Sequence, residues 1–483
     1  MQQADELFLL IRSLTASEKR YFKLQANKYE SDSYKSHYEK LFDALNYWPA
    51  EEYDEALFKK RNKGKTFLKN LAYEKVYLRD LILKVMRSYH SEKNVEIKVH
   101  ELILDLTFLT DKGLGALASK LHKQASALAV SAELFPEQLT LNHLQLRFKT
   151  KGLVKNAENA KAYEQKERTL ISNIKLTRIA FHLLTQLYEL QASGKWKERT
   201  EEVETIYKRV NKLETHAAIT NRARLAFLNC KALYFFRKKN YTECYKLCSQ
   251  FINDIETRDE MKFLKSHSYY NTISNCLYAA MMLQKFDAFP ELFARLEGIE
   301  AHSEYENFEI FRTLCNYKMV FAFNTSDFSN TEALEKQTLL GLKKFNHLLT
   351  VAERTTNYFN LALLYFLQRN FDRSLHFTSP LFASDDGKQT NLVIIGRFIE
   401  WICLFETGQI DVLENKLRNL NRLIKEYGES TLLKNSAEIL KLKLKTIGMK
   451  KQHIKFPELA EDNNTAPEIE QLKGIITYWL EGR

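Results

Sequence analysis

Short polar turns followed by a bulky apolar residue recur along this chain at nearly constant spacing. The intervals between these apolar residues are 39, 43, 45, 45, 42, 43 and 39. A period of this size is typical of stacked helical hairpins, in which each unit contacts only its neighbours. Once short connections are subtracted, the period predicts helices of about 17 residues. We expect each of these repeat positions to open the second helix of its hairpin: Leu114, Leu153, Trp196, Tyr241, Phe286, Phe328, Phe371 and Ile410.

Residues 357–377 contain the clearest unit. An apolar helix runs to Leu367, a polar turn follows, and Phe371 begins a second helix. The pattern Asn360-Leu361-Ala362, Tyr365, Phe371 and Ser374 resembles a tetratricopeptide repeat, with Ala362 and Arg369 at two positions where that family has glycine. The resemblance implies a right-handed α-solenoid, a superhelix of helical hairpins. The unit length leaves a second family open, since tetratricopeptide units have about 34 residues and HEAT or armadillo units about 40–47.

Composition agrees with long helices joined by short turns. Only 14 Gly and 6 Pro occur among 483 residues, and 12% of the residues are aromatic rings that can fill the gaps between helices. All six cysteines lie inside apolar helical segments, which indicates buried thiols in a reducing compartment. The N-terminus lacks a basic region before its apolar residues, and no run of 18 apolar residues occurs. We therefore expect a cytoplasmic protein with no membrane segment.

The pattern divides the chain into three parts. Residues 1–92 are predicted to form an N-terminal helical domain, residues 93–455 the tetratricopeptide-like repeats, and residues 456–483 a linker and a C-terminal capping helix. Thr15 and Glu18 form a capping-box pattern. The segment Leu14–Lys23 resembles the opening of a group of uncharacterised bacterial helical-repeat proteins, which implies no activity. The helices expected around the repeats are 18–24, 34–45, 54–61, 66–89, 430–445 and 468–480.

Few motifs point to chemistry, and each has a structural alternative that we favour. Gly113–Ala118 matches a dinucleotide-binding pattern but coincides with a predicted hairpin turn. Gly64-Lys65-Thr66 lacks the leading glycine of a phosphate-binding loop, because Lys59 occupies that position. Cys244 and Cys248 lack further ligands at metal spacing and are expected to be buried thiols. The sequence predicts no catalytic residue, cofactor or metal, and a protein that is not an enzyme.

The function expected from this architecture is a protein- or peptide-binding scaffold. In the resembling family, first helices line the concave face, where Asn and basic side chains hold the backbone or terminal carboxylate of a peptide. An amide both donates and accepts hydrogen bonds, and Arg forms bidentate pairs with carboxylates. Laying the family pattern on this chain gives five candidate peptide-binding residues, while the partner and the oligomeric state stay open. They are Arg237, Asn275, Tyr278, Asn316 and Asn360.

The alternative is a nucleic-acid-binding regulator whose repeats sense a peptide. The net charge is +11, and the segment Lys59–Arg87 contains ten Lys or Arg against Glu74 and Asp80. Its interleaved rings, Phe67, Tyr73 and Tyr77, suit a nucleic-acid-binding face. The plainer interpretation is a solvated helix whose rings pack inward. No convincing helix-turn-helix is present, because the helices expected here are unequal in length.

Overall fold

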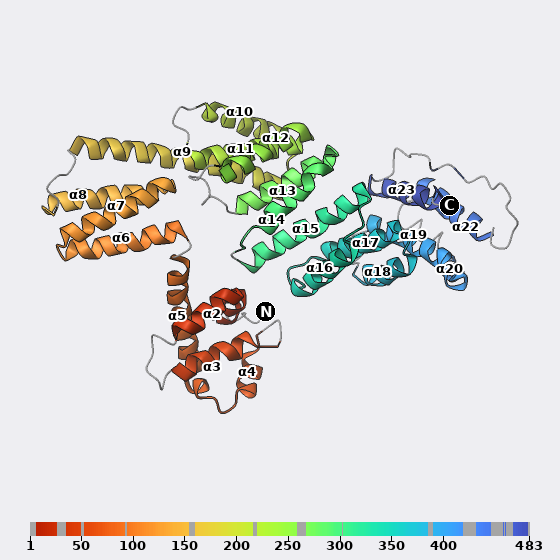
Figure 1. Cartoon of the computed structure of the whole chain (residues 1–483), viewed down its shortest axis with the longest axis horizontal. Helices are drawn as coiled ribbons and strands as arrows, with labels where there is room; N and C mark the ends of the chain where they lie inside the picture. The colour runs from red at the N-terminus through yellow and green to blue at the C-terminus, as the bar shows by residue number, and fades with distance from the viewer. Residues whose placement is uncertain are drawn as a thin grey trace. The chain divides into compact units, whose positions relative to one another are not determined.

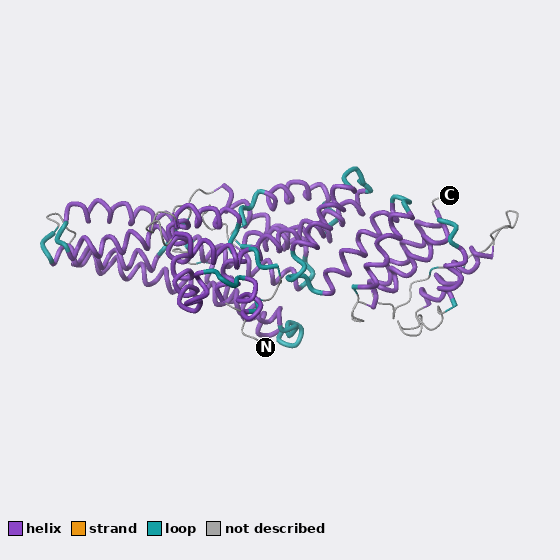
Figure 2. The backbone as a smooth tube through the Cα atoms, turned by 90° about the horizontal axis from the view of Figure 1, so that it is seen from below, coloured by secondary structure: helices purple, strands orange, loops and turns teal. Residues whose placement is uncertain are grey.

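The structure is a computed structural model. It describes residues 6–26, 35–49, 53–91, 94–153, 160–215, 220–257, 267–301, 303–384, 390–418, 431–445, 457, 459 and 467–481. Across these residues all regular structure is helical, with 22 α-helices, two short 3-10 helices and no β-strand (Figure 1; Figure 2). The prediction of an all-α chain is confirmed. The chain divides into two compact units, Met1–Asn307 and Phe308–Arg483, each with its own hydrophobic clusters.

The N-terminal helices enclose a core of aromatic side chains, including the fully buried Phe22, Phe42 and Phe58. The predicted capping box is confirmed: the Thr15 N–H donates to Glu18 Oε2 over 2.7 Å, and the Glu18 N–H donates to Thr15 Oγ1 over 3.3 Å. The helix predicted from Thr66 opens instead with a 3-10 turn. The elements are α1 (Glu6–Ser13), α2 (Ala16–Ala26), α3 (Lys35–Asn46), α4 (Glu55–Arg61), η1 (Thr66–Asn70) and α5 (Leu71–Ser91).

The remaining helices form successive antiparallel hairpins. Six of them have 17 residues each, as the period predicts. Those in the first unit are α6 (Val95–Asp111), α7 (Gly115–Ser131), α8 (Phe135–Thr150), α9 (Ala160–Ala192), α10 (Thr200–Glu214), α11 (Asn221–Arg237), α12 (Tyr241–Thr257), α13 (His267–Met282), η3 (Phe286–Ala288) and α14 (Phe289–Glu297).

The second unit begins within α15, which spans the boundary between the two units. Its elements are α15 (Glu304–Thr325), α16 (Thr331–Lys344), α17 (Val351–Leu367), α18 (Phe371–Ala383), α19 (Thr390–Glu406), α20 (Ile410–Leu417), α22 (Thr431–Lys445) and α23 (Pro467–Glu481).

Helices pack against their neighbours in the sequence and also against the next helix but one. Within the first unit α6 contacts both α7 and α8, and α11 contacts both α12 and α13. Within the second unit α17 contacts both α18 and α19. Contacts of this kind stack one hairpin on the next, so apolar faces that a single hairpin leaves open are covered.

The turns inside the hairpins share one backbone conformation. A residue with positive φ, such as Lys239 (φ 59°) or Arg369 (φ 58°), ends the first helix. Its N–H and the next N–H donate to carbonyls of the last helical turn, as in the bonds Arg369 N to Phe366 O (2.9 Å) and Asn370 N to Tyr365 O (3.0 Å). The same positive φ and pair of hydrogen bonds occur at Gly113, Gly152, Gln284 and Gly408. Positive φ also occurs at Gly194 and Ser326 in hairpin turns, and at Glu133 between two hairpins.

The repeat positions follow these turns, but not all of them open a helix. Tyr241, Phe371 and Ile410 begin α12, α18 and α20 as predicted. The prediction is wrong for Trp196 and Phe328, which lie in the connections before α10 and α16, and for Leu114, which immediately precedes α7. Phe286 opens the short 3-10 helix η3, and the residues that follow Leu153 lie outside the described ranges. Near Phe328 the Asp327 carboxylate accepts bonds from the N–H (3.1 Å) and hydroxyl (2.6 Å) of Ser329, and this local turn delays the helix.

A second difference is helix α9, where two helices of about 17 residues were expected. Ala160–Ala192 forms one continuous helix of 33 residues, and this stretch contains neither Gly nor Pro. Its first half packs on α8, with the Asn142 amide donating to Tyr163 O over 3.4 Å. Its second half shares a core with α10 and α11. α9 therefore serves as the second helix of one hairpin and the first helix of the next.

The glycine motifs lie in turns, as we favoured. Gly113 has φ 72° between α6 and α7, and residues 103–109, which precede it, are helical. Gly64 has φ 88° in the turn before η1. The predicted capping helix is present as α23, which packs on α19 and α22. The linker predicted before it lies outside the described residues, apart from Pro457, Leu459 and the first residue of α23, Pro467.

Candidate functional site

All five candidate peptide-binding residues lie on first helices of hairpins. In the first unit Arg237 is the last residue of α11, and Asn275 and Tyr278 lie on α13. In the second unit Asn316 lies on α15 and Asn360 on α17. Arg237 is exposed and the other four are half-buried, so all five keep a surface that a ligand can reach.

Arg237 and Tyr278 meet in one cluster of rings, here called the Arg237 cluster. The Arg237 guanidinium lies 5.8 Å from the ring centre of Trp196 and 5.7 Å from that of Phe236. Phe236 is 4.9 Å from Tyr278, and Tyr278 is 5.9 Å from Tyr241. Guanidinium groups are attracted to ring faces at such distances. Two of the members, Trp196 and Tyr241, are repeat positions, so the turns of successive hairpins supply this cluster.

The turn after α11 explains why these side chains converge. Lys239 takes positive φ, its N–H donates to Phe236 O over 3.1 Å, and the Asn240 N–H donates to Phe235 O over 2.9 Å. The reversal brings Tyr241 back to Phe236, with ring centres 6.4 Å apart. Asn240 then caps α12 by accepting from the Glu243 N–H over 3.2 Å.

The electrostatics of the Arg237 cluster favour an anionic ligand. Arg237 has no hydrogen-bonding or carboxylate partner in the part of the chain that the structure describes. Burial, followed by the neighbouring Tyr241, raises the pKa of Tyr278, so its hydroxyl stays protonated at neutral pH. A guanidinium held against aromatic rings is suited to a carboxylate, which can accept two hydrogen bonds from it.

The three candidate asparagines share an unused amide. None of Asn275, Asn316 and Asn360 has a side-chain hydrogen bond within the described ranges, although each is half-buried. Other asparagines on first helices are engaged: Asn229 accepts from Thr272 Oγ1 over 2.9 Å, and Asn357 donates to Glu353 O over 2.7 Å. The three free amides are therefore available to an extended peptide backbone.

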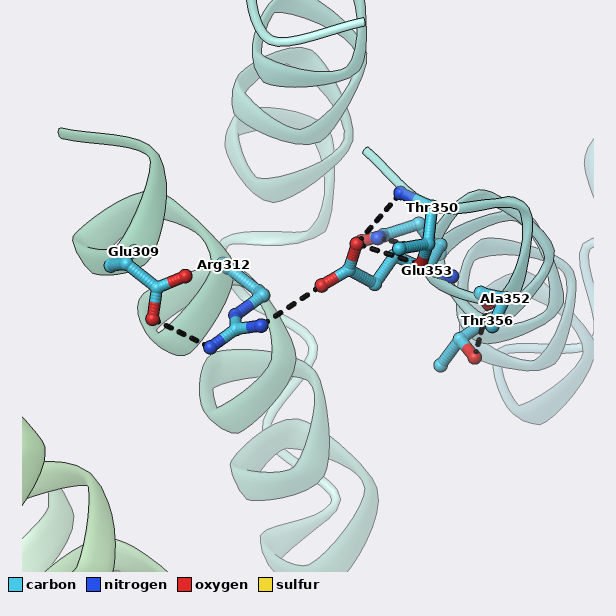
Figure 3. Close-up of polar contacts among 7 residues, drawn as sticks. Glu309, Arg312, Thr350, Ala352, Glu353 and Thr356 are labelled. Atoms are coloured by element: carbon cyan, nitrogen blue, oxygen red, sulfur yellow. Dashed lines mark hydrogen bonds and ion pairs between the residues drawn. The ribbon is translucent and has the colours of Figure 1, made fainter. Parts of the chain in front are cut away.

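Two contacts hold α15 against α17 in the second unit, where Asn316 and Asn360 lie. Arg312 donates to Glu309 over 2.6 Å and to Glu353 over 3.0 Å, while Thr350 caps α17 through the same Glu353 (Figure 3). Burial alone would raise the pKa of Glu353, but the bonds from Thr350 and Arg312 hold this pKa below its ordinary value. The second contact is Cys315 Sγ with Asn357 Oδ1, at 3.2 Å.

The basic segment Lys59–Arg87 differs in part from the interpretation as a solvated helix whose rings pack inward. Phe67 is buried, but Tyr73 is 62% exposed and Tyr77 39% exposed, so two of the three rings do not pack fully inward. Tyr77 stacks on Tyr38 with ring centres 4.4 Å apart. Glu55 pairs with Lys59 and Lys75 at 2.6 and 3.0 Å. Five exposed cations have no ion pair among the residues described: Lys60, Lys63, Lys65, Lys69 and Arg87.

One group of side chains that the sequence did not indicate could hold a metal ion. Glu96, His100 and Glu137 place one ligand atom each within 4.8 Å of one another. His100 Nε2 and Glu137 Oε1 are 2.9 Å apart and join α6 to α8. The spacing of Glu96 and His100 on one helix is the sequence signal that could have indicated this group. The direct contact between His100 and Glu137 accounts for this geometry without an ion.

The cysteines are free and buried, as predicted. Burial raises the pKa of Cys230 to about 12 and that of Cys276 to about 11, which keeps both thiols protonated at neutral pH.

No helix in the described ranges has the length and apolar character needed to cross a bilayer. Comparison of the chain with models of protein families, with curated proteins and with solved structures finds no match.

Proposed function

We propose that this chain is a non-enzymatic scaffold that binds a peptide or protein segment along the first helices of a tetratricopeptide-like α-solenoid. Two features support the solenoid. Helices contact their next-but-one neighbours in both units, and turns with positive φ recur at the repeat spacing. Stacked hairpins of this kind present extended surfaces that bind peptides and proteins.

The observation that carries the binding function is the Arg237 guanidinium, which lies against the rings of Trp196 and Phe236 and has no ion-pair partner among the described residues. An exposed Arg that no carboxylate of the described residues neutralises, held against Trp196 and Phe236, is preorganised for a bidentate contact with a carboxylate. The free amides of Asn275, Asn316 and Asn360 support the same function, since each can donate to and accept from a peptide backbone. The ligand class favoured is a segment with a terminal or side-chain carboxylate.

A peptide array tests this proposal directly. Full-length protein is applied to matched peptides whose C-termini are free or amidated. We expect binders that prefer the free carboxylate, and we expect Arg237→Ala with Asn275→Ala to abolish that preference while the melting temperature is kept. Lys238→Ala is the matched control, because this neighbouring cation already pairs with Glu204 at 2.7 Å. Equal binding by the double variant and the wild type would remove these residues as the site. A pull-down from the source cell then names the partner.

The solenoid itself is tested by solution scattering. A compact globule of 483 residues has a radius of gyration of about 23 Å. We expect a clearly larger value, because hairpins that stack only on their neighbours add mass along one direction. A value near that of the globule would argue against the solenoid.

A nucleic-acid-binding regulator remains the second candidate, because Tyr73 and Tyr77 are exposed in the same segment as the five cations that have no ion pair among the described residues. Exposed rings can stack on bases and exposed cations contact phosphates. Titration of fluorescent duplex DNA at about 50 mM and about 200 mM salt distinguishes the two functions. Tight binding that weakens steeply with salt, and is lost in Lys63→Ala with Lys65→Ala, would favour the regulator. Absence of binding at the lower salt concentration would exclude it.

A further inference from the structure

We propose that the exposed face of α5 binds an amphipathic helix of a partner protein whose apolar seam is flanked by acidic side chains. The large apolar side chains of this face, here called the α5 stripe, are Tyr73, Val76, Tyr77 and Leu83. The α5 stripe shares no residue with the Arg237 cluster, so this inference goes beyond the proposed function and is tested independently of it.

The α5 stripe occupies one side of its helix. At about 100° per residue, its members lie within about 120° of the helix circumference. The opposite side, with Leu78, Ile82 and Val85, is buried in the N-terminal core. Tyr73 keeps 62% of its surface exposed and Leu83 keeps 42%. Contiguous exposed apolar side chains on a soluble protein mark surfaces where another molecule binds.

One ring of the α5 stripe is already held in position. Tyr77 stacks on Tyr38 of α3 with ring centres 4.4 Å apart, and Tyr38 is itself buried. A ring fixed by a buried neighbour loses little side-chain entropy when a partner binds. Tyrosine is also enriched at the centres of protein–protein interfaces. The face is therefore partly preorganised for a protein partner.

The charges around the α5 stripe determine what can cover it. Lys69 lies four residues before the first member of the stripe and Arg87 four residues after the last, and both are exposed with no ion pair in the described part of the chain. Asp80 lies between them, but Arg79 neutralises it by donating twice to Asp80 Oδ1, over 3.0 and 2.8 Å. The face is thus apolar along its middle and positive at both ends. A complementary partner has acidic side chains at both ends of its apolar seam.

The same charges argue against a second copy of this chain as the occupant. In a parallel pair of α5 helices, Lys69 would face its own copy. In an antiparallel pair centred on the α5 stripe, Lys69 would face Arg87. Like charges meet in both arrangements, and such contacts oppose association.

Nucleic acid is disfavoured for a different reason. Val76 and Leu83 present aliphatic surface, which does not stack on bases as aromatic rings do and does not contact phosphates. An acidic amphipathic helix covers these two residues, the tyrosines and the flanking cations together. The span from Lys69 to Arg87 corresponds to about 27 Å of helix, so a partner helix of about 18 residues reaches both cations.

The experiment uses the full chain and three fluorescein-labelled helical peptides of about 18 residues. The acidic peptide has a leucine seam flanked by Glu, the basic peptide has the same seam flanked by Lys, and the third peptide has Glu flanks with Gln in place of the leucines. We expect the acidic peptide to bind at least about tenfold more tightly than either of the others, measured by fluorescence anisotropy.

Variants of the protein assign this binding to the α5 stripe. Tyr73→Ser with Leu83→Ser should weaken binding of the acidic peptide at least about tenfold, because it removes two members of the stripe. Lys69→Glu with Arg87→Glu should reverse the preference, so that the basic peptide binds more tightly than the acidic one. All four side chains are exposed, so the fold and the melting temperature should be kept.

The chain supplies matched controls on other helices. Leu104→Ser with Phe108→Ser on α6 removes two exposed apolar side chains, and Lys120→Glu with Lys123→Glu on α7 reverses two exposed cations. Both control variants should bind the acidic peptide as the wild type does.

Three results would overturn the proposal directly: no binding of the acidic peptide, equal affinity for the acidic and basic peptides, or unchanged binding in Tyr73→Ser with Leu83→Ser. Two further results would replace the partner helix by another occupant. A labelled DNA or RNA strand whose binding is lost in Lys69→Glu with Arg87→Glu, but kept in Val76→Ser with Leu83→Ser, would make this face a nucleic-acid site. A concentration-dependent dimer that Tyr73→Ser with Leu83→Ser disperses would make the occupant a second copy of this chain.

Discussion

Glu335 on α16 joins three consecutive helices. It is buried, and it accepts hydrogen bonds from Tyr365 on α17 and from Arg373 Nε on α18, the latter over 3.2 Å. Glu204 on α10 is arranged similarly, with Tyr234 Oη at 3.0 Å and Lys238 Nζ at 2.7 Å. In both cases the tyrosine follows the glutamate by 30 residues. The same polar contact thus ties a second helix to the next hairpin in both units.

Glu335 predicts a loss of stability in acid. Burial alone would raise the pKa of Glu335, but the bonds from Arg373 and Tyr365 lower it below its ordinary value. Its stabilising contribution is therefore complete above about pH 4.3 and is lost as the pH falls through the lower value in the folded state. We expect Glu335→Gln to cost about 1–3 kcal/mol at pH 7 and less at pH 3.5, by urea denaturation. Glu332→Gln, exposed on the same helix, is the control. A pH-independent difference would contradict this account.

The turn residues give a stabilising substitution. Gln284 has φ 57°, a conformation that costs a residue with a Cβ about 1–2 kcal/mol relative to glycine. Glycine loses more conformational entropy on folding, which offsets part of this gain. Gln284→Gly should therefore raise the free energy of unfolding by about 0.5–1 kcal/mol. Met282→Gly, at the end of α13, should lower it by a similar amount because it weakens a helix. Chemical denaturation of both variants checks the opposite signs.

At the scale of helices, the repeat positions are half-buried, apart from the exposed Leu114. Phe371 opens α18 and lies 5.9 Å from Phe366, yet it keeps part of its ring exposed. Truncating a fully buried Phe costs about 3–5 kcal/mol, so we expect about 2 kcal/mol for Phe371→Ala, with partner binding preserved. Thermal denaturation and a binding assay check this. An unchanged melting temperature with lost binding would make Phe371 a ligand contact instead.

The sequence predicted the helical class, the 17-residue length of six helices and the starts of α12, α18 and α20, because the spacing of apolar residues is a local signal. It did not reveal the turn at Glu133, which has positive φ without being glycine. Glu133 is held there by tertiary contacts, since its carboxylate accepts from the N–H groups of Asn221 and Arg222 on α11, both at 2.9 Å. The five candidate site residues were placed correctly on first helices. Their free amides and the ring cluster around Arg237 depend on packing between hairpins, which spacing alone does not contain.

At the scale of the whole molecule, the two compact units, and contacts made mostly between helices close in the sequence, predict unfolding in more than one step. The four tryptophans report on different parts: Trp48 on the N-terminal core, Trp196 on the α9–α11 core, and Trp401 and Trp479 on the α19–α23 core. We expect variants that keep only Trp48 or only Trp401 to show different midpoints in urea, followed by fluorescence. Identical midpoints would indicate one cooperative unit.

The continuous helix α9 has a consequence for how this chain tolerates changes in length. A turn absorbs an inserted residue by bulging, but a helix turns by about 100° for each residue added. One alanine inserted after Ser172 would therefore rotate the face that packs on α8 relative to the face that packs on α11. The same insertion after Gly194, in the turn before α10, should leave the melting temperature nearly unchanged. The length of α9 thus fixes the rotation of its α8-facing side relative to its α11-facing side. Evolution can therefore insert residues in the turns of this chain far more easily than within α9.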